Sequence, residues 1–214
     1  MISILSLSKK FGSHAAIEDV FLEICDGETV VLQGPSGSGK TTLLRLIAGL
    51  EVPDDGEIFF DGKLASSPKG VLPPYQREVG IVFQRSALWP HMTVAKNILF
   101  CMDGKDPGEN RRYLNWILQE LELSELVHRY PSQLSGGEAR RVALGRALAR
   151  KAKYLLLDEP LTSLNPELKA RLLQVILHAK QDDGAALLYI THDIEEARSI
   201  GGRLVQLKMG RLAV

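Results

Sequence analysis

The chain has 214 residues, 45% of them hydrophobic, so it can bury one sizeable core but is short for two independent domains. Its 26 basic and 26 acidic side chains balance, which argues against nucleic acid or an acidic membrane surface as a partner. The two cysteines, Cys25 and Cys101, have no metal-ligand spacing, and no apolar run approaches the roughly 20 residues that cross a bilayer, so we expect a chain of the reducing cytoplasm.

Two kinds of strand pattern occur along the chain. Residues 2–24 and 56–63 form short β-like runs that Gly and Asp interrupt, which predicts a small antiparallel lobe. Other runs are continuously apolar and end in a polar residue, which is typical of strands buried on both faces of a parallel sheet. These apolar runs are residues 29–33, 79–84, 154–159 and 187–192.

Residues 34–41, GPSGSGKT, fit the phosphate-binding loop G-x-x-x-x-G-K-[ST] and lie between an apolar run and a helix-like stretch, 42–48. Glycines let several N–H groups and the positive end of the helix face one anion, while Lys40 adds a point charge and the Thr41 hydroxyl a Mg²⁺ ligand. The sequence therefore predicts a nucleoside triphosphate site. Its expected binding residues in this loop are Gly34, Pro35, Ser36, Gly37, Ser38, Gly39, Lys40, Thr41 and Thr42.

Polar residues end the later apolar runs. Gln84 ends the run that begins at residue 79, Asp158 and Glu159 end the next, and His192 ends the last. In a parallel sheet the ligand crevice lies outside the carboxyl ends of the strands. We therefore expect these four side chains to gather with the phosphate loop at one edge of the sheet.

Between residues 89 and 150 the pattern becomes helical. One apolar face there consists of Leu114, Ile117, Leu118 and Leu121. Tyr113 and Trp116 are expected to pack this lobe rather than to bind a ligand. Residues 103–109, DGKDPGE, have the composition of a surface loop, and a hairpin is expected at residues 208–211.

Residues 134–138, LSGGE, place a hydroxyl and two glycines at the start of another helix, 139–150. An isolated motif of this kind is more often a plain capping box, with Ser135 as N-cap and Glu138 at the third helical position. The rest of the chain changes that interpretation. The phosphate loop, Gln84, LSGGE, the apolar run that ends in DEP, and His192 follow one another as in the ATP-binding-cassette (ABC) ATPases. The chain resembles this family over nearly its whole length.

The resemblance implies an α/β fold of the P-loop NTPase (RecA-like) class, with a parallel-sheet core, an N-terminal antiparallel β lobe and an α-helical lobe. It makes residues 1–214 a single ABC ATPase domain. The ATP-binding core with its β lobe would cover about residues 1–85 and 151–214, and the helical lobe about residues 86–150.

The family also implies an ATP-dependent homodimer. Two copies bind head to tail, so that each ATP lies between the phosphate loop of one copy and Ser135, Gly136 and Gly137 of the other. Binding of ATP would close this dimer, and hydrolysis would open it.

The catalytic roles follow from the same resemblance. Glu159 would be the general base, and His192 would hold the γ-phosphate and the attacking water in line. Thr41 and Gln84 would ligate Mg²⁺, with Asp158 holding the ion directly or through water. The predicted catalytic set is therefore Glu159, His192, Gln84 and Lys40, and the predicted metal set is Thr41, Gln84 and Asp158.

At three positions the chain departs from the family pattern. Phe11 takes the place of the aromatic residue that stacks on adenine, where the family more often has tyrosine; a core phenylalanine is the alternative. Asn165 stands where the family has the aspartate of S-x-L-D, so the communication between paired sites that this aspartate supports is not implied here. Glu138 replaces a more usual glutamine.

Residues 84–94 and 130–134 look like those of importer cassettes that energise uptake of small solutes through a separate membrane permease, with a solute-binding protein in the same system. The chain would then lie in the cytoplasm, peripheral on the inner face of the cell membrane. A cassette of the lipoprotein-release or cell-division type and a soluble ABC ATPase are the alternatives. The sequence does not identify the transported solute, because a cassette does not touch it.

The segment after Gln84 is unusually apolar or aromatic for a loop, with Leu88, Trp89, His91 and Met92 close together. We interpret it as part of a groove that receives a short helix of the membrane subunit; the alternative is that Trp89 belongs to the core of the helical lobe. Many importer cassettes carry a further C-terminal regulatory domain. Since this sequence ends at Val214, we expect that form of control to be absent.

Overall fold

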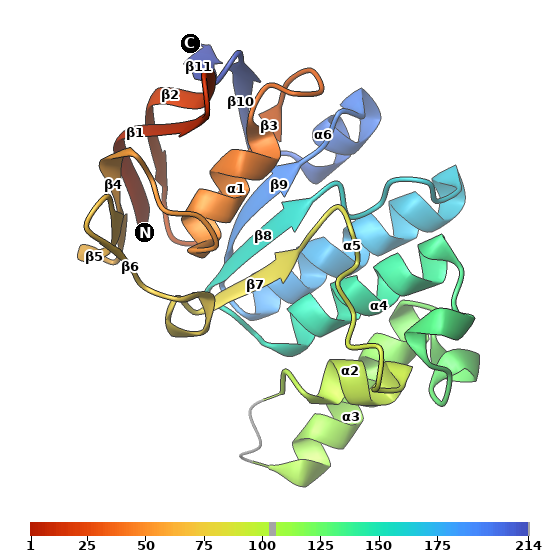
Figure 1. Ribbon diagram of the computed structural model, residues 1–214. Helices are drawn as coiled ribbons and strands as arrows, with labels where there is room; N and C mark the ends of the chain where they lie inside the picture. Colours follow the sequence, from red (N-terminus) through yellow and green to blue (C-terminus); the bar gives the residue numbers. More distant parts are fainter. Residues whose placement is uncertain (103–105, 214) are drawn as a thin grey trace.

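The computed structural model describes residues 1–102 and 106–213. Within these residues the chain forms two sheets, with α1 (Lys40–Ala48) between them and the other α-helices on the outer side of the larger sheet (Figure 1). The larger sheet has the strand order β11-β10-β3-β9-β8-β7, in which β11 alone runs antiparallel to its neighbour. Its strands are β3 (Thr29–Gln33), β7 (Val79–Val82), β8 (Tyr154–Asp158), β9 (Ala186–Ile190), β10 (Arg203–Lys208) and β11 (Arg211–Ala213).

The smaller sheet is the antiparallel lobe that the sequence predicts, with the strand order β2-β1-β4-β5-β6. Its strands are β1 (Ile2–Phe11), β2 (His14–Ile24), β4 (Asp55–Phe60), β5 (Lys63–Ser67) and β6 (Gly70–Val71). At the hairpin between β1 and β2, Phe11 pairs with His14, which places these two side chains next to each other at the end of the lobe.

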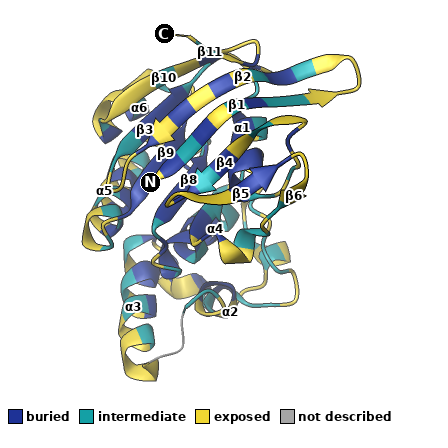
Figure 2. Cartoon of the chain, turned by 90° about the vertical axis from the view of Figure 1, so that its left-hand side faces the viewer, coloured by how far each residue is buried: buried dark blue, intermediate teal, exposed yellow. Residues whose placement is uncertain are grey.

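The parallel sheet separates two hydrophobic cores (Figure 2). Successive residues of β3 alternate between them: Val30 and Leu32 belong to the core between the two sheets, around α1 (Lys40–Ala48), while Val31 belongs to the core under the outer helices. Because both faces are covered, every residue of β8 and of β9 is buried. This double burial explains why these strands appear as continuous apolar runs in the sequence.

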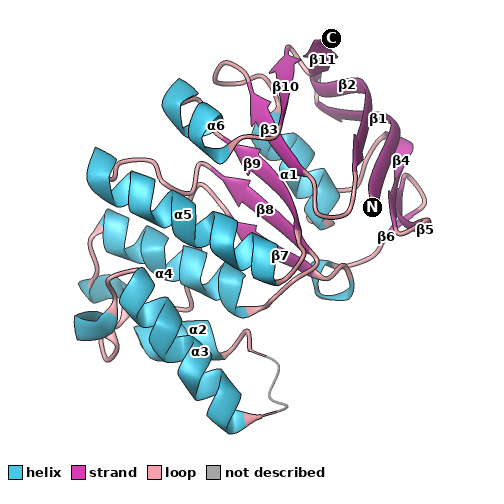
Figure 3. Cartoon of the chain, turned by 180° about the vertical axis from the view of Figure 1, so that it is seen from behind, coloured by secondary structure: helices cyan, strands magenta, loops and turns pink. Residues whose placement is uncertain are grey.

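The outer core is formed by helices that stack on the far side of the parallel sheet (Figure 3). They are α2 (Val94–Leu99), α3 (Pro107–Glu120), α4 (Gly136–Ala149), α5 (Pro166–Asp182) and α6 (Ile194–Ile200), with the short 3-10 turns η2 (Ser124–Leu126) and η3 (Pro131–Gln133). A third turn, η1 (Pro74–Gln76), precedes β7. The apolar face predicted from Leu114 to Leu121 is buried in this core, and Tyr113 stacks on Trp116 at its border with ring centroids 5.5 Å apart. No helix in the described ranges combines the length and apolarity that crossing a membrane requires.

Two features differ from the sequence-based expectation. The parallel strand β10 is not predicted by the apolar pattern, because five of its six residues are exposed or half-buried and Leu207 alone is buried. The loop predicted over residues 103–109 is wrong at its end: Pro107 begins α3, and the Asp106 side chain caps it by accepting a hydrogen bond of 2.8 Å from Gly108 N. Residues 103–105 lie outside the described residues. The hairpin at 208–211 is confirmed by the pairing of Lys208 with Arg211.

Candidate functional site

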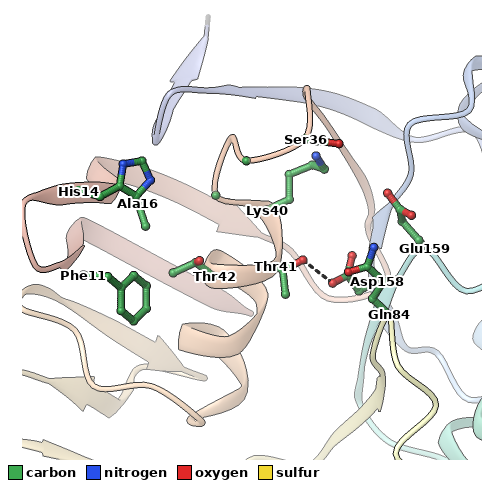
Figure 4. Close-up of a pocket in the computed structure, with 12 residues that line it drawn as sticks. Phe11, His14, Ala16, Ser36, Lys40, Thr41, Thr42, Gln84, Asp158 and Glu159 are labelled. Carbon is green, nitrogen blue, oxygen red and sulfur yellow. Dashed lines mark hydrogen bonds between the residues drawn. The ribbon is translucent and has the colours of Figure 1, made fainter.

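A cavity of about 360 Å³ lies at the carboxyl edge of the parallel sheet, where the phosphate loop passes from β3 into α1 (Figure 4). Its walls come from both sheets and from the segments after β7 and β8. The lining residues are Phe11, His14, Ala16, Ser36, Gly37, Gly39, Lys40, Thr41, Thr42, Gln84, Asp158 and Glu159. Figure 4 shows Phe11 and His14 at one end and Gln84, Asp158 and Glu159 at the other, with Lys40 and Thr41 between them.

The phosphate loop is shaped by close backbone approaches. A side chain at Gly39, which has φ +105°, would place its Cβ 2.2 Å from the Ala16 carbonyl oxygen, and one at Gly34 would lie 2.1 Å from that of Leu207. Gly37 instead faces open space. Only glycine can therefore occupy the two crowded positions without moving β2 or β10.

Lys40 is mostly buried, and its Nζ donates hydrogen bonds to the carbonyl oxygens of Gly34 and Pro35, at 2.8 and 2.9 Å. The ammonium group thus already lies inside the loop, with no carboxylate required to hold it there. The Ser38 hydroxyl is buried and has no hydrogen-bond partner among the described residues. A cationic loop with an unsatisfied buried hydroxyl fits a phosphate ligand, which offers acceptor oxygens to both groups.

Next to the loop, Thr41 Oγ1 donates a hydrogen bond of 2.7 Å to Asp158 Oδ2 (Figure 4). Asp158 is almost fully buried, and this burial raises its pKa, while the Thr41 hydrogen bond and the nearby Lys40 act in the opposite direction. Gln84 lines the same end of the cavity. A hydroxyl, a carboxylate and an amide are the oxygen donors that Mg²⁺ prefers, so the three residues fit that ion.

Glu159 follows Asp158 in a left-handed backbone conformation, with φ +48°. Each of its carboxylate oxygens has a partner: His192 Nδ1 lies 3.0 Å from Oε1, and Thr162 Oγ1 donates to Oε2 at 3.3 Å. Because a carboxylate oxygen only accepts, His192 is the donor in this contact, through Nδ1. The structure therefore brings Glu159 and His192 together as a pair, although His192 is exposed and does not line the cavity.

At the other end of the cavity, Phe11 is 49% exposed, so it is not a core phenylalanine. The Lys9 ammonium lies 5.5 Å from its ring centroid. His14 and Ala16 share this end of the cavity and are absent from the sequence-based set. The signal that could have found them is the hairpin itself, because a turn directly after Phe11 places His14 opposite the ring.

The structure does not bring every predicted ATP-binding residue to this cavity. Ser135, Gly136 and Gly137 are not among its lining residues. Ser135 and Gly136 are exposed at the start of α4, where Ser135 Oγ accepts from Glu138 N and Glu138 Oε2 accepts from Ser135 N, at 3.3 and 2.7 Å. The capping box that the motif indicates on its own is therefore present.

The segment after Gln84 lies against the helical part of the molecule. Leu88, Trp89 and Met92 are half-buried, and His91 is exposed. The buried Asn97 side chain accepts from Trp89 N at 2.9 Å and donates to the carbonyl oxygen of Met92 at 3.0 Å. The Trp89 ring contacts Arg146, whose guanidinium carbon lies 4.7 Å from the ring centroid, and Phe100, and it is not part of the outer core.

Comparisons with known proteins agree with this geometry. The model of the ABC transporter family matches residues 17–162, well over half of the chain. The chain is 46% identical over 217 residues to the sulfate/thiosulfate import ATP-binding protein CysA of Caulobacter vibrioides, covering 99% of this chain and 63% of that protein. It is 39% identical over 215 residues to the spermidine/putrescine import ATP-binding protein PotA of Nitrosomonas europaea, covering 99% of this chain and 58% of that protein.

The chain therefore spans about three fifths of the length of these curated relatives. A solved structure of the ATP-binding cassette MJ0796, a dimeric post-hydrolysis state bound to ADP and Pi, superposes with a TM-score of 0.89 at 32% identity, covering 100% of this chain and 97% of that one. The α/β fold with a parallel-sheet core is thus that of an ABC cassette, as the sequence predicts. On these grounds the chain belongs to the ABC transporter family.

Proposed function

We propose that this chain is the ATP-binding subunit of an ABC transporter and hydrolyses ATP in a head-to-tail dimer to drive solute uptake through a separate membrane subunit. The observation that carries the proposal is the meeting of three groups at one sheet edge: the loop that holds Lys40, the Thr41–Asp158 pair and the Glu159–His192 pair. Together they supply phosphate binding, metal ligands and a base.

The residues divide the reaction between them. The Lys40 ammonium and the N–H groups at the start of α1 bind the phosphates, and Thr41, Gln84 and Asp158 would hold Mg²⁺. When bound, Mg²⁺ offsets the charge on the β- and γ-phosphate oxygens. Glu159 accepts a proton from the attacking water through its carboxylate, and His192, which pairs with Glu159 through Nδ1, would hold the γ-phosphate and that water in line. Phe11 and His14 offer ring faces for the base of the nucleotide.

The cavity supports a dimer because it is built from one half of the expected site. The exposed helix start at Ser135 is a second anion-binding end that the same cavity does not use. A second copy related by a two-fold axis would bring this helix start to the nucleotide of the first, and two equivalent sites would result. Two similar structures of the cassette MJ0796 are dimeric.

The transport role is supported by the relatives, which are import ATP-binding proteins for sulfate/thiosulfate, spermidine/putrescine, trehalose/maltose and Fe(3+) ions. We extend this to a permease that contacts the segment at Leu88, Trp89, His91 and Met92, to a solute-binding protein in the same system and to a position on the inner face of the membrane. A cassette of the lipoprotein-release type and a soluble ATPase remain the alternatives. Co-purification of an integral membrane protein with the tagged chain distinguishes the transporter classes from the soluble one.

The decisive experiment uses Glu159→Gln. The amide keeps the shape of the side chain but cannot accept the proton, so we expect ATP binding to persist while turnover falls about 10²–10⁴-fold. The trapped species should elute as a dimer in size-exclusion chromatography with ATP and Mg²⁺, and the wild-type chain should not accumulate it. Wild-type turnover of the variant, or a monomer with ATP demonstrably bound at high protein concentration, contradicts the base assignment and the dimer.

A further inference from the structure

Arg140 crosses from α4 to two loops that border the site. It lies five residues after the Ser135 cap. Its Nη1 donates to the carbonyl oxygen of Thr162 at 2.6 Å, and its Nη2 donates to that of Gln84 at 2.9 Å. One guanidinium group thus joins three segments: the helix that begins at Ser135, the segment that carries a predicted metal ligand and the segment that follows the predicted base.

Thr162 connects Arg140 to Glu159 through its backbone carbonyl and its side-chain hydroxyl. The backbone carbonyl of Thr162 is held by Arg140, and its hydroxyl donates to Glu159 Oε2. Both Glu159 and Ser163 have positive φ, at +48° and +66°, so the backbone on both sides of Thr162 is in a conformation that needs support from its surroundings. The pair of hydrogen bonds that the Arg140 guanidinium donates to Gln84 and Thr162, here called the Arg140 fork, is one such support.

The neighbouring arginine on α4 has different partners, whereas Arg146, further along the helix, also donates to the segment after Gln84, to the carbonyl oxygen of Ala87 at 2.9 Å. Arg141 donates through Nη1 to the carbonyl oxygens of Leu121 and Glu122, at 3.0 and 3.2 Å, and to the Glu122 carboxylate at 3.2 Å, in the helical part of the molecule. Both arginines have a buried Nε with no partner among the described residues, and both bind backbone carbonyls. Of the two, Arg140 is the one that donates to the segments of Gln84 and Thr162.

We propose that Arg140 is a positioning residue: its fork fixes Gln84 and, through Thr162, the Glu159 carboxylate relative to the helix that begins at Ser135. The proposal rests on the proposed function, because it assigns Glu159 as the base. It predicts a linkage between paired sites. The helix start that one copy offers to its partner's nucleotide moves together with the copy's own base and metal-ligand segment.

The test compares Arg140→Gln with the control Arg141→Gln, which removes the neighbouring arginine from the same helix, together with its two carbonyl contacts and its ion pair with Glu122. Steady-state ATP hydrolysis by the purified chain should show kcat lowered about 10–100-fold in Arg140→Gln, the range that small misplacements of reacting groups produce, with KM for ATP little changed. Arg141→Gln should keep its kcat, although its thermal unfolding midpoint falls. Arg140→Lys should recover part of the loss, because one ammonium can reach one of the two carbonyls but cannot span both.

A second readout needs neither nucleotide nor metal. Hydrogen exchange of the nucleotide-free chain should be faster in peptides that cover residues 84–88 and 159–165 in Arg140→Gln, and unchanged there in Arg141→Gln. Thr162→Val, which removes only the hydroxyl, should lower kcat without changing exchange at residues 84–88. These two measurements carry the test even where Arg140→Gln is too unstable for kinetics, since Arg140→Lys and Thr162→Val can replace it.

The proposal is overturned if kcat of Arg140→Gln stays within about twofold of wild type, a difference well below the 1.4 kcal/mol of a tenfold change. It is also overturned if the two arginine variants lose kcat and stability in parallel, which is the result for a merely structural residue. A wild-type chain that hydrolyses ATP no faster than Glu159→Gln contradicts the proposed function instead. In that case, unchanged exchange in both loops still overturns the role of Arg140.

Discussion

Two helix starts in this molecule are suited to anions, yet they are built in opposite ways. α1 begins at Gly39 in a left-handed conformation with no side-chain cap, and its first residue, Lys40, is buried inside the loop. α4 begins at Ser135 with both halves of a capping box in place, and it is exposed. The first N–H groups of α1 therefore depend on a ligand, whereas those of α4 are partly satisfied by the chain itself. We therefore expect the α1 end to bind its anion within one chain, and the α4 end to be stable without a partner and available to one.

The largest expected effect comes from damaging the two helix starts separately and then mixing the variants. Lys40→Ala removes the phosphate charge at α1, and Ser135→Arg blocks the start of α4, so each variant alone should lose nucleotide-dependent association and about 10²–10³-fold of its hydrolysis. A heterodimer of the two contains one doubly damaged site and one intact site. The equimolar mixture should therefore recover part of the nucleotide-dependent association, measured by light scattering, and part of the ATP hydrolysis. A mixture that performs no better than either variant alone contradicts the assignment of Ser135 to the partner's nucleotide.

A methyl group at each helix start sharpens the comparison at the level of stability. Gly39→Ala would force Cβ to within 2.2 Å of the Ala16 carbonyl oxygen at φ +105°, whereas a Cβ at Gly136 has no heavy atom within 4 Å. We expect Gly39→Ala to lower the free energy of unfolding by about 2–4 kcal/mol through crowding and backbone strain. Gly136→Ala should leave it unchanged or raise it slightly, since alanine favours helix. Urea unfolding followed by circular dichroism measures both, and equal midpoints for the two variants contradict this account of the loop.

The smallest expected effect is a pH dependence of stability that arises from the capping box of α4. Hydrogen bonding by the backbone N–H of Ser135 lowers the pKa of Glu138. A carboxyl group whose pKa is lower in the folded state contributes stability above its unfolded pKa, near 4.3, and loses it as pH falls through the folded value. Glu138→Gln keeps the capping geometry without the charge. The free energy of unfolding of the wild type should therefore exceed that of the variant by about 0.3–1 kcal/mol at pH 7. This advantage should shrink as pH falls from about 5 to 3 in urea titrations, and a constant difference contradicts the contribution of the charge.

The sequence predicts most of the parallel sheet because its central strands are covered on both faces. The inner residues of β3, β8 and β9 are apolar for that reason, and β3 is predicted at its observed bounds. β10 is not predicted, because it lies next to the edge of the sheet and five of its six residues are exposed or half-buried. A strand of this kind leaves no apolar run to detect.

The candidate site divides in a similar way. The loop residues, the Thr41–Asp158 pair and the Glu159–His192 pair are found from motif and strand end, because local sequence fixes their positions. His14 depends on the register of a hairpin, and Arg140 on how α4 packs against two distant loops. Spacing along the chain carries no signal for contacts of that kind, so only the three-dimensional structure reveals them.

The left-handed backbone at Glu159 has a consequence for attempts to make this protein more robust. Asparagine and glycine adopt such a conformation more readily than glutamate does, so they relieve strain at this position. A selection for heat resistance alone would therefore favour the loss of the very carboxylate that we assign as the base. Stabilised variants of the chain should accordingly be screened for ATP turnover at every round, because a substitution that relieves backbone strain at Glu159 also removes the proposed general base.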